Sequence, residues 1–145
     1  MKIEIKINKN LKEPILTIEA PSLNEDIKKI TDYINSIKTD VLTGEYMDKI
    51  EVINQDEIIK IFAQDKKVYA LVHNKILTLK LPLYEIEKRL RNSFLRISNS
   101  EIINVKKIKS IDLDFIGTIC ITLSNSESVY CSRRYVSIIR KKLGI

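Results

Sequence analysis

The spacing of apolar residues divides the chain into a short first part and a longer second part. Isoleucines alternate with charged and polar residues near the N-terminus, and this period of two predicts a strand over residues 3–7 with one buried face. A second strand is predicted over residues 14–20. From residue 23 to 38 the apolar residues recur every three or four positions, which predicts a helix with one apolar stripe. Such a ββα segment, residues 1–45, buries too little surface to fold alone, so we expect it to pack on the rest of the chain or on a second copy.

The second part of the chain, residues 46–145, is rich in short strand patterns. Residues 39–48, which include Gly44, follow neither period and are predicted to be a linker. Short polar breaks between the strands predict hairpins and therefore antiparallel sheets. No internal repeat is evident, and the fold class is mainly β with a few helices. The predicted strands are 50–53, 58–63, 68–72, 76–80, 94–97, 108–115, 119–123 and 128–131, and the predicted helices are 82–92 and 133–143.

The composition is that of an ordinary globular protein. Of the 145 residues, 44% are hydrophobic and 30% are charged, which excludes a disordered chain. No apolar run approaches the roughly 20 residues that cross a bilayer, and the N-terminus does not resemble a secretory signal. The two cysteines match no zinc-binding spacing. We therefore expect a cytoplasmic protein.

Charge is distributed unevenly along the chain. Residues 1–65 contain 9 Lys and Arg against 13 Asp and Glu, whereas residues 66–145 contain 16 against 6. A C-terminal half with this excess of cations favours a polyanionic partner, either nucleic acid or an acidic membrane surface. A solvated basic surface is the alternative that charge alone leaves open.

The residues for common enzyme chemistry are missing or isolated. Three glycines in the whole chain are too few for a phosphate-binding loop, which needs glycines so that backbone amides can approach the anion. His73 is the only histidine and lies in a predicted turn. Asp112 and Asp114 share one face of a predicted strand, but two carboxylates do not close a metal site. We expect no enzymatic activity, no cofactor, no metal and no small-molecule substrate.

Two polar clusters stand out, and each follows a predicted strand. The first extends from Arg96 through Asn99 to Lys107, and the second is Ser132-Arg133-Arg134-Tyr135. Serine suits a helix N-cap, but arginines there are disfavoured by the helix dipole, so an anionic partner is one explanation for them. Arginine can pair with guanine in a major groove, and asparagine can pair with adenine. The alternative is that these groups only cap turns.

Residues 46–145 resemble the LytTR family of bacterial DNA-binding domains. The resemblance depends on three motifs and on the position of the last two near the C-terminus. The motifs are Pro82-Leu83-Tyr84-Glu85-Ile86-Glu87, Phe94-Leu95-Arg96-Ile97-Ser98-Asn99-Ser100-Glu101-Ile102-Ile103-Asn104-Val105, and Ser132-Arg133-Arg134-Tyr135. The whole chain is similar to stand-alone LytTR regulators, which carry a short N-terminal segment instead of a receiver domain.

The resemblance implies a fold of small stacked antiparallel sheets whose loops enter successive major grooves of promoter DNA. It assigns base contacts to Lys66 and Lys67 in the turn at 65–67, to Asn99 and to Arg134. The phosphate contacts that we expect are Arg96, Ser98, Lys106, Lys107 and Arg133. It also implies control by a protein partner, often one bound to the membrane. We further expect a homodimer that associates through residues 1–45.

Two other classes of function compete with this hypothesis. A small basic RNA-binding or ribosome-associated protein fits the charge, but it would usually expose clustered aromatic residues, and here the tyrosines are dispersed. An interaction module at an acidic membrane would usually carry a basic amphipathic helix, which is missing. Duplex DNA is therefore the expected partner.

Overall fold

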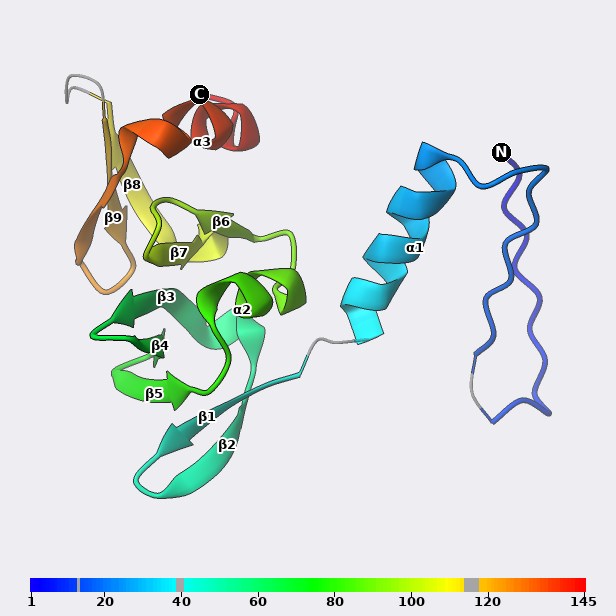
Figure 1. Ribbon diagram of the computed structural model, residues 1–145, viewed down its shortest axis with the longest axis horizontal. Coiled ribbons are helices and arrows are strands. Elements are labelled where there is room, and N and C mark those ends of the chain that lie inside the picture. The colour runs from blue at the N-terminus through cyan, green and yellow to red at the C-terminus, as the bar shows by residue number, and fades with distance from the viewer. Residues whose placement is uncertain (13, 39–40, 114–117) are drawn as a thin grey trace.

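The computed structural model describes residues 1–12, 14–38, 41–113 and 118–145. In these residues the fold is mainly β, with two antiparallel sheets and three α-helices (Figure 1). The strands are β1 (Leu42–Tyr46), β2 (Lys49–Ile53), β3 (Ile58–Gln64), β4 (Lys67–Val72), β5 (Lys75–Leu79), β6 (Phe94–Arg96), β7 (Glu101–Asn104), β8 (Ile108–Asp112), β9 (Ile119–Leu123) and β10 (Ser128–Cys131). The α-helices are α1 (Glu25–Lys38), α2 (Leu83–Arg89) and α3 (Val136–Leu143), and the 3-10 helices are η1 (Gln55–Glu57), η2 (Val105–Lys107) and η3 (Arg133–Tyr135).

The strands pair with neighbours that run in the opposite direction, as the short polar breaks predict. The larger sheet has the order β2-β1-β5-β4-β3-β7-β6, and the smaller has the order β10-β9-β8. The predicted strands in both sheets are confirmed to within one or two residues, apart from 108–115. That strand ends at Asp112, and its last two predicted residues, with the predicted turn around Gly117, lie outside the described residues.

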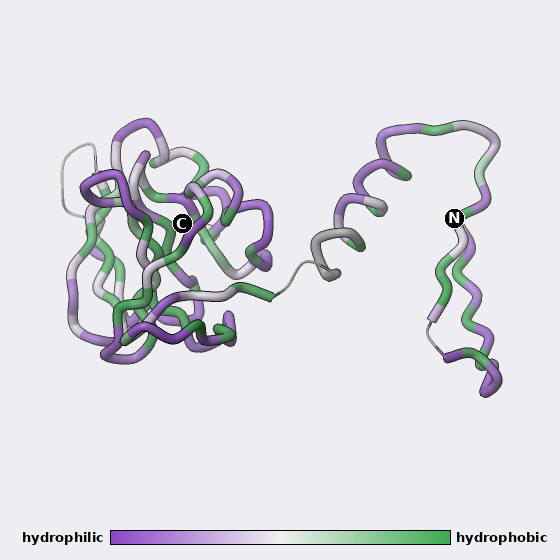
Figure 2. Tube along the Cα trace, turned by 60° about the horizontal axis from the view of Figure 1, so that its bottom comes forward, coloured by the Kyte–Doolittle hydropathy of each residue, from purple (hydrophilic) through white to green (hydrophobic). Residues whose placement is uncertain are grey.

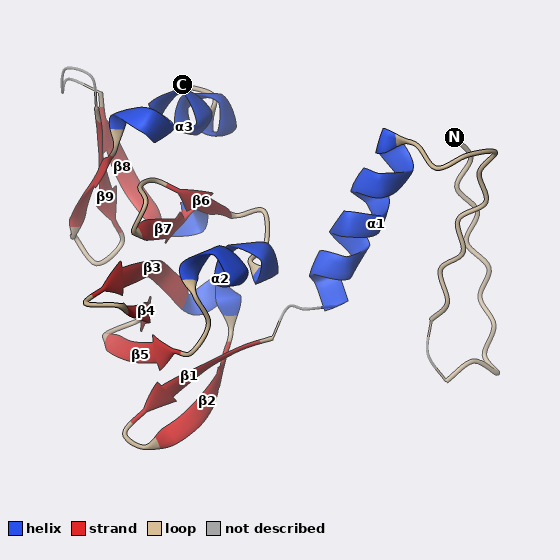
Figure 3. Cartoon of the chain, viewed as in Figure 1, coloured by secondary structure: helices blue, strands red, loops and turns tan. Residues whose placement is uncertain are grey.

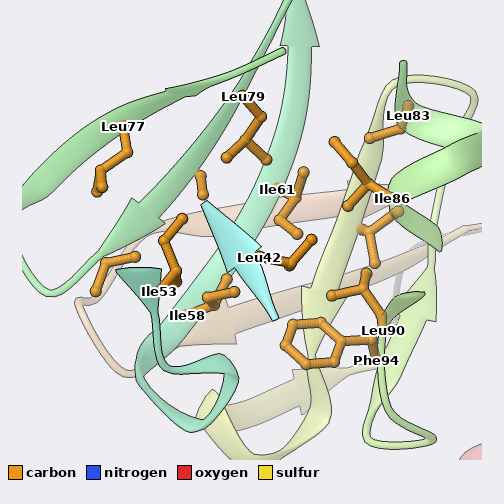
Figure 4. Packing of buried hydrophobic residues seen from close by; sticks show 13 residues of the cluster. Leu42, Ile53, Ile58, Ile61, Leu77, Leu79, Leu83, Ile86, Leu90 and Phe94 are labelled. Carbon is orange, nitrogen blue, oxygen red and sulfur yellow. The ribbon is translucent and has the colours of Figure 1, made fainter. Parts of the chain in front are cut away.

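Two apolar cores cover the two faces of the larger sheet. On one face α2 and its C-cap contribute Leu83, Ile86 and Leu90, which point toward the side chains of the sheet (Figure 4). On the other face the smaller sheet and α3 close the second core, in which Ile121 and Ile139 are fully buried. The larger sheet is therefore the central layer, and its strands β3, β4, β6 and β7 contribute residues to the second core as well as lying beside the first.

Strand β7 was not predicted, and its burial explains why. Ile102 belongs to the first core and Ile103 to the second, so the strand is buried on both faces and shows no period of two. Asn104, at the end of the strand, is also fully buried. Its Nδ2 donates to the carbonyl of Ile58 at 2.9 Å, which satisfies a polar side chain inside the core.

The predicted linker at 39–48 is wrong over residues 42–46, which form β1. Leu42 and Gly44 are buried while Thr43 and Glu45 are exposed, so the segment does alternate. Gly44 is required by packing, because a Cβ atom there would lie 2.8 Å from the Cβ atom of Leu77. Residues 39–40 lie outside the described residues.

The two strands predicted near the N-terminus are not formed in the described residues before α1. Residues 1–12 and 14–22 carry no strand (Figure 3), and Ile3, Ile5 and Ile7 are each more than 80% exposed. Figure 2 shows the alternating hydropathy of this segment. A half-apolar strand needs a partner for its apolar face, and this segment contributes no residue to either core. The predicted helix is confirmed as α1, and Asn24 caps it by accepting from the amide of Ile27.

A short structural repeat was also missed. η1 and η2 each follow an asparagine, Asn54 or Asn104, whose side chain accepts a hydrogen bond from the amide two residues later at 3.1 Å. Each is followed by an isoleucine, Ile58 or Ile108, and by a strand with a shift in register. We call η1 the first corner and η2 the second corner. Their sequences, Asn-Gln-Asp-Glu-Ile and Asn-Val-Lys-Lys-Ile, share only the asparagine and the isoleucine.

Candidate nucleic-acid interface

Three segments that are far apart in sequence meet at one edge of the molecule. The amide of Ala63, near the end of β3, donates to the carbonyl of Ser100 at 2.8 Å. The amide of Ser132 donates to the carbonyl of Ile97 at 2.9 Å. These two bonds join the β3–β4 turn, the β6–β7 loop and η3, and we call this edge the rim: residues 64–67, 97–100 and 132–135.

The β3–β4 turn presents two of the predicted base-contacting residues to solvent. Asp65 and Lys66 both have positive φ, 51° and 65°, which is the backbone of the tight turn that best matches the twist of two paired strands. Lys66 and Lys67 are exposed. The turn therefore holds Lys66 at its tip, in a backbone conformation that disfavours most side chains.

Arg96 shapes the β6–β7 loop from within. Its Nε donates to the carbonyl of Ser98 at 2.7 Å, its Nη2 donates to the carbonyl of Asn99, and its Nη1 pairs with Glu87 of α2. The side chain is only 19% exposed. Ser98 contributes through its Oγ, which accepts from the amide of Ser100 at 3.2 Å. The resemblance predicts that Arg96 and Ser98 contact phosphate, but the guanidinium of Arg96 and the hydroxyl of Ser98 both bond to the backbone of the loop. Asn99 is exposed at the tip of the loop.

The segment after β10 carries the two predicted arginines. Its first turn is the 3-10 helix η3, and α3 begins only at Val136, so the predicted helix at 133–143 starts with a tighter turn. Ser132 makes no side-chain capping bond; its amide and its hydroxyl both point to the carbonyl of Ile97. Arg133 and Arg134 are exposed. The hydroxyl of Tyr135 donates to Oδ1 of Asn99 at 3.1 Å, which places Asn99 beside η3.

The structure separates Lys106 and Lys107 from the rim. Both lie in the second corner, at the end of β7 opposite the loop, and a strand of this length spans roughly 13 Å. Lys106 is 62% exposed, and its Nζ lies 3.5 Å from Oδ1 of Asp56. Arg91 reaches the same carboxylate at 3.3 Å. The first polar cluster of the sequence therefore forms two separate basic sites.

A buried lysine under the rim was missed by sequence reasoning. Lys60 is 9% exposed, and its Nζ lies 2.7 Å from Glu127 and 3.7 Å from Glu101. The carbonyl of Glu101 accepts from the amide of Ile97 at 3.0 Å, at the base of the β6–β7 loop. Lys60 thus links the smaller sheet to this loop, and alternating patterns along β3 give no signal for a charged residue inside the structure.

The remaining candidates for chemistry lie apart from the rim or are unreactive. His73 has a φ of 54° in the β4–β5 turn, and its Nε2 lies 3.6 Å from Glu57, with both side chains exposed. Burial raises the pKa of the Cys131 thiol to about 11, and nearby Cys120 and Glu101 add to this effect, so the thiol is protonated at neutral pH. No group of three or more potential metal ligands occurs in the described parts of the chain. Within the same parts, every helix is too short or too polar to cross a bilayer.

Exposed cations on loops of a rigid β framework define a class of protein that contacts polyanions through loops. The family model described as the LytTr DNA-binding domain matches residues 48–144. The chain belongs to this family and is a DNA-binding transcriptional regulator.

Similar proteins agree with the assignment. Two proteins of Staphylococcus aureus, from strains NCTC 8325 and MRSA252, are each named an uncharacterized HTH-type transcriptional regulator and are 38% and 37% identical to this chain. Each match covers 100% of this chain and 99% of the relative. A solved structure, the LytTr DNA-binding domain of a putative methyl-accepting/DNA response regulator from Bacillus cereus, is 34% identical and has a TM-score of 0.70. That match covers 73% of this chain and 98% of the solved chain.

Proposed function

We propose that the protein binds promoter DNA in a sequence-specific manner by placing the loops of the rim in the major groove. The observation that carries this proposal is the set of hydrogen bonds that joins three distant segments at one edge and brings Asn99 beside η3. Exposed cations lie on two of the three segments and an exposed carboxamide on the third. Fixed polar groups read base edges, whereas mobile charges mainly neutralise phosphates.

The assignments of base and phosphate contacts follow the resemblance to the family, and the structure bears on how two further side chains act. We assign base contacts to Asn99 and Arg134, and to Lys66 and Lys67 at the turn. We assign phosphate contacts to Arg133 at the rim and to the two lysines of the second corner. Arg96 and Ser98, whose polar groups are used inside the loop, act in this proposal by holding Asn99 in place.

Selection of bound duplexes from a random pool tests the proposal. The full chain is incubated with random duplexes, and the recovered sequence is then used in competition with single strands and with structured RNA. We expect one enriched site and competition only by duplex DNA. An even pool after several rounds would contradict sequence reading, and competition by RNA would favour an RNA-binding protein instead.

We propose a homodimer that forms through residues 1–45. The support is the exposed apolar side of this segment, since isoleucines 3, 5, 7 and 15 are each more than 70% exposed. Sedimentation of the full chain at micromolar concentration should give twice the chain mass. The variant Ile3→Asn/Ile5→Asn/Ile7→Asn should give a monomer, and a monomeric wild type would contradict the proposal.

The resemblance to stand-alone regulators leads to three further proposals. The protein acts in the cytoplasm, without enzymatic activity, and a membrane-protein regulator controls it. Crosslinking in cells from a photoreactive residue at position 5 tests the last of these. A crosslinked product in the membrane fraction is expected, and products in the soluble fraction alone would contradict it.

A further inference from the structure

Tyr135 is next to Arg134 in the chain and contacts Asn99, two of the residues to which we assign base contacts. It directly follows Arg134 in η3, and its hydroxyl donates to Oδ1 of Asn99 at 3.1 Å. The tyrosine is partly buried and packs against the second core, so its ring has a fixed position. The hydroxyl is therefore presented to the carboxamide by a rigid support.

The rest of the β6–β7 loop is held by other groups. Arg96 binds the carbonyls of Ser98 and Asn99, and Ser132 binds the carbonyl of Ile97. These bonds fix the backbone of the loop but leave the carboxamide of Asn99 free to turn about its last side-chain torsion, which has two broad minima. Of the described contacts, the hydroxyl of Tyr135 is the one that reaches the carboxamide, and because a phenol hydroxyl donates better than it accepts, it favours Oδ1 over Nδ2 at this place.

This distinction decides which base edge the side chain fits. Adenine presents an acceptor, N7, beside a donor, N6, so an asparagine must place Nδ2 at N7 and Oδ1 at N6. A half turn of the carboxamide exchanges the two ends and removes both bonds. The oxygen has two lone pairs, so Oδ1 can accept from Tyr135 and from N6 together.

We infer that Tyr135 is a specificity-determining residue, whose hydroxyl holds the carboxamide of Asn99 in the orientation that reads adenine. The inference rests on the proposed base contact of Asn99. It gives η3 two roles in recognition, since Arg134 contacts DNA directly and Tyr135 acts through its neighbour.

Three variants of the full chain test this inference against the duplex recovered from the random pool and its single-pair substitutions. Asn99→Ala identifies the A·T pair that Asn99 reads, because preference at that pair is lost. Tyr135→Phe keeps the ring and should lower preference at the same pair by about 3- to 10-fold, the effect of one neutral hydrogen bond. Tyr84→Phe, which removes an exposed tyrosine hydroxyl on α2, should change nothing.

The outcomes separate this inference from the proposed function. If Asn99→Ala alters no pair, the base contact of Asn99 itself is wrong. If Asn99→Ala removes a preference that Tyr135→Phe leaves intact, only the role of Tyr135 is wrong. A tyrosine that merely supports the fold would weaken binding to every duplex by one factor and lower the melting temperature, and that result would also overturn the inference.

Discussion

At the rim, hydrogen bonds from Arg96 and Tyr135 hold the β6–β7 loop, whereas at the second corner cations extend into solvent on long side chains. Arg96 is 19% exposed and binds two carbonyls and a carboxylate, while Lys106 is 62% exposed with one carboxylate at 3.5 Å. A fixed group loses little freedom on binding and can discriminate between bases. A mobile charge attracts any duplex. The difference suggests that sequence preference and general affinity arise at separate places.

The largest expected effect follows from dismantling the rim. Arg96→Met leaves the carbonyls of Ser98 and Asn99 without their partner, which should lower the free energy of unfolding by about 2 kcal/mol. Affinity for the selected duplex should fall at least about tenfold. Arg91→Met, which removes a half-exposed ion pair with Asp56, should cost under about 1 kcal/mol. Urea unfolding measures the stability of the two variants, and fluorescence anisotropy measures their affinity for the duplex. Equal losses in the two variants would contradict a special role for Arg96.

The next largest effect concerns one exposed group of the rim. Arg134→Ala should weaken the selected duplex by about 1–3 kcal/mol and flatten preference at one base pair, because a forked contact to guanine is lost. Arg133→Ala is the matched control, since the proposed phosphate contact carries no base preference. The affinity of each variant is measured for the selected duplex and for all of its single-pair substitutions. Identical behaviour of the two variants would contradict the assigned roles.

The second corner should respond with salt dependence and without a change in preference. Lys106→Ala should weaken all duplexes alike and reduce the slope of log affinity against log salt by about one. Stability should change by less than about 1 kcal/mol, because the ion pair with Asp56 is exposed. Titrations between low and moderate salt provide the slope. An unchanged slope would exclude Lys106 from phosphate contact.

A smaller effect with opposite signs is expected at the β3–β4 turn. Lys66 has a φ of 65°, so Lys66→Gly should raise the free energy of unfolding by about 1 kcal/mol. The same change removes a proposed DNA contact and should weaken binding by about threefold. Lys49→Ala, at an exposed position on β2, the strand at the other edge of the larger sheet, is a control for charge alone. Binding unaffected by Lys66→Gly would remove this turn from the interface.

The last effect, a loss of stability that is absent at neutral pH, lies beneath the rim, at Cys131. Burial raises the pKa of its thiol from 9.0 to about 11, so the folded state retains a proton that the unfolded state loses first. This contribution to stability is complete below pH 9 and is lost as the pH rises toward 11. The difference in unfolding free energy between wild type and Cys131→Ala should therefore shrink over that range. A constant difference would contradict the shift in pKa.

Much of the fold follows from the sequence, and the failures have physical causes. The hairpins β3–β4 and β4–β5 end at polar turns, so the breaks between their apolar segments were sufficient to predict them. β7 is buried on both faces and ends at a buried asparagine, which leaves no alternation to detect. In β1, Gly44 looked like a flexible linker residue. It is a glycine because Leu77 of the neighbouring strand β5 packs against it, and the sequence does not show that contact.

The candidate site was only partly accessible from the sequence. Resemblance to a family assigned Asn99 and Arg134 to one interface, and the structure places Asn99 beside η3, the turn that carries Arg134. The interactions of Arg96, Lys60 and Tyr135 could not be predicted, since the partner of each side chain lies in another segment of the chain. The sequence also groups Lys106 with the β6–β7 loop in one polar cluster, although strand β7 separates the two in the structure.

The two corners separate the path of the backbone from the charge that it displays. One has Asp56 and Glu57 after its asparagine, the other has Lys106 and Lys107, and the turn is the same. Evolution can therefore exchange these side chains without refolding the joint. Under the proposed phosphate contacts of Lys106 and Lys107, such exchanges would change overall affinity for DNA and leave the preference for sequence at the rim unchanged.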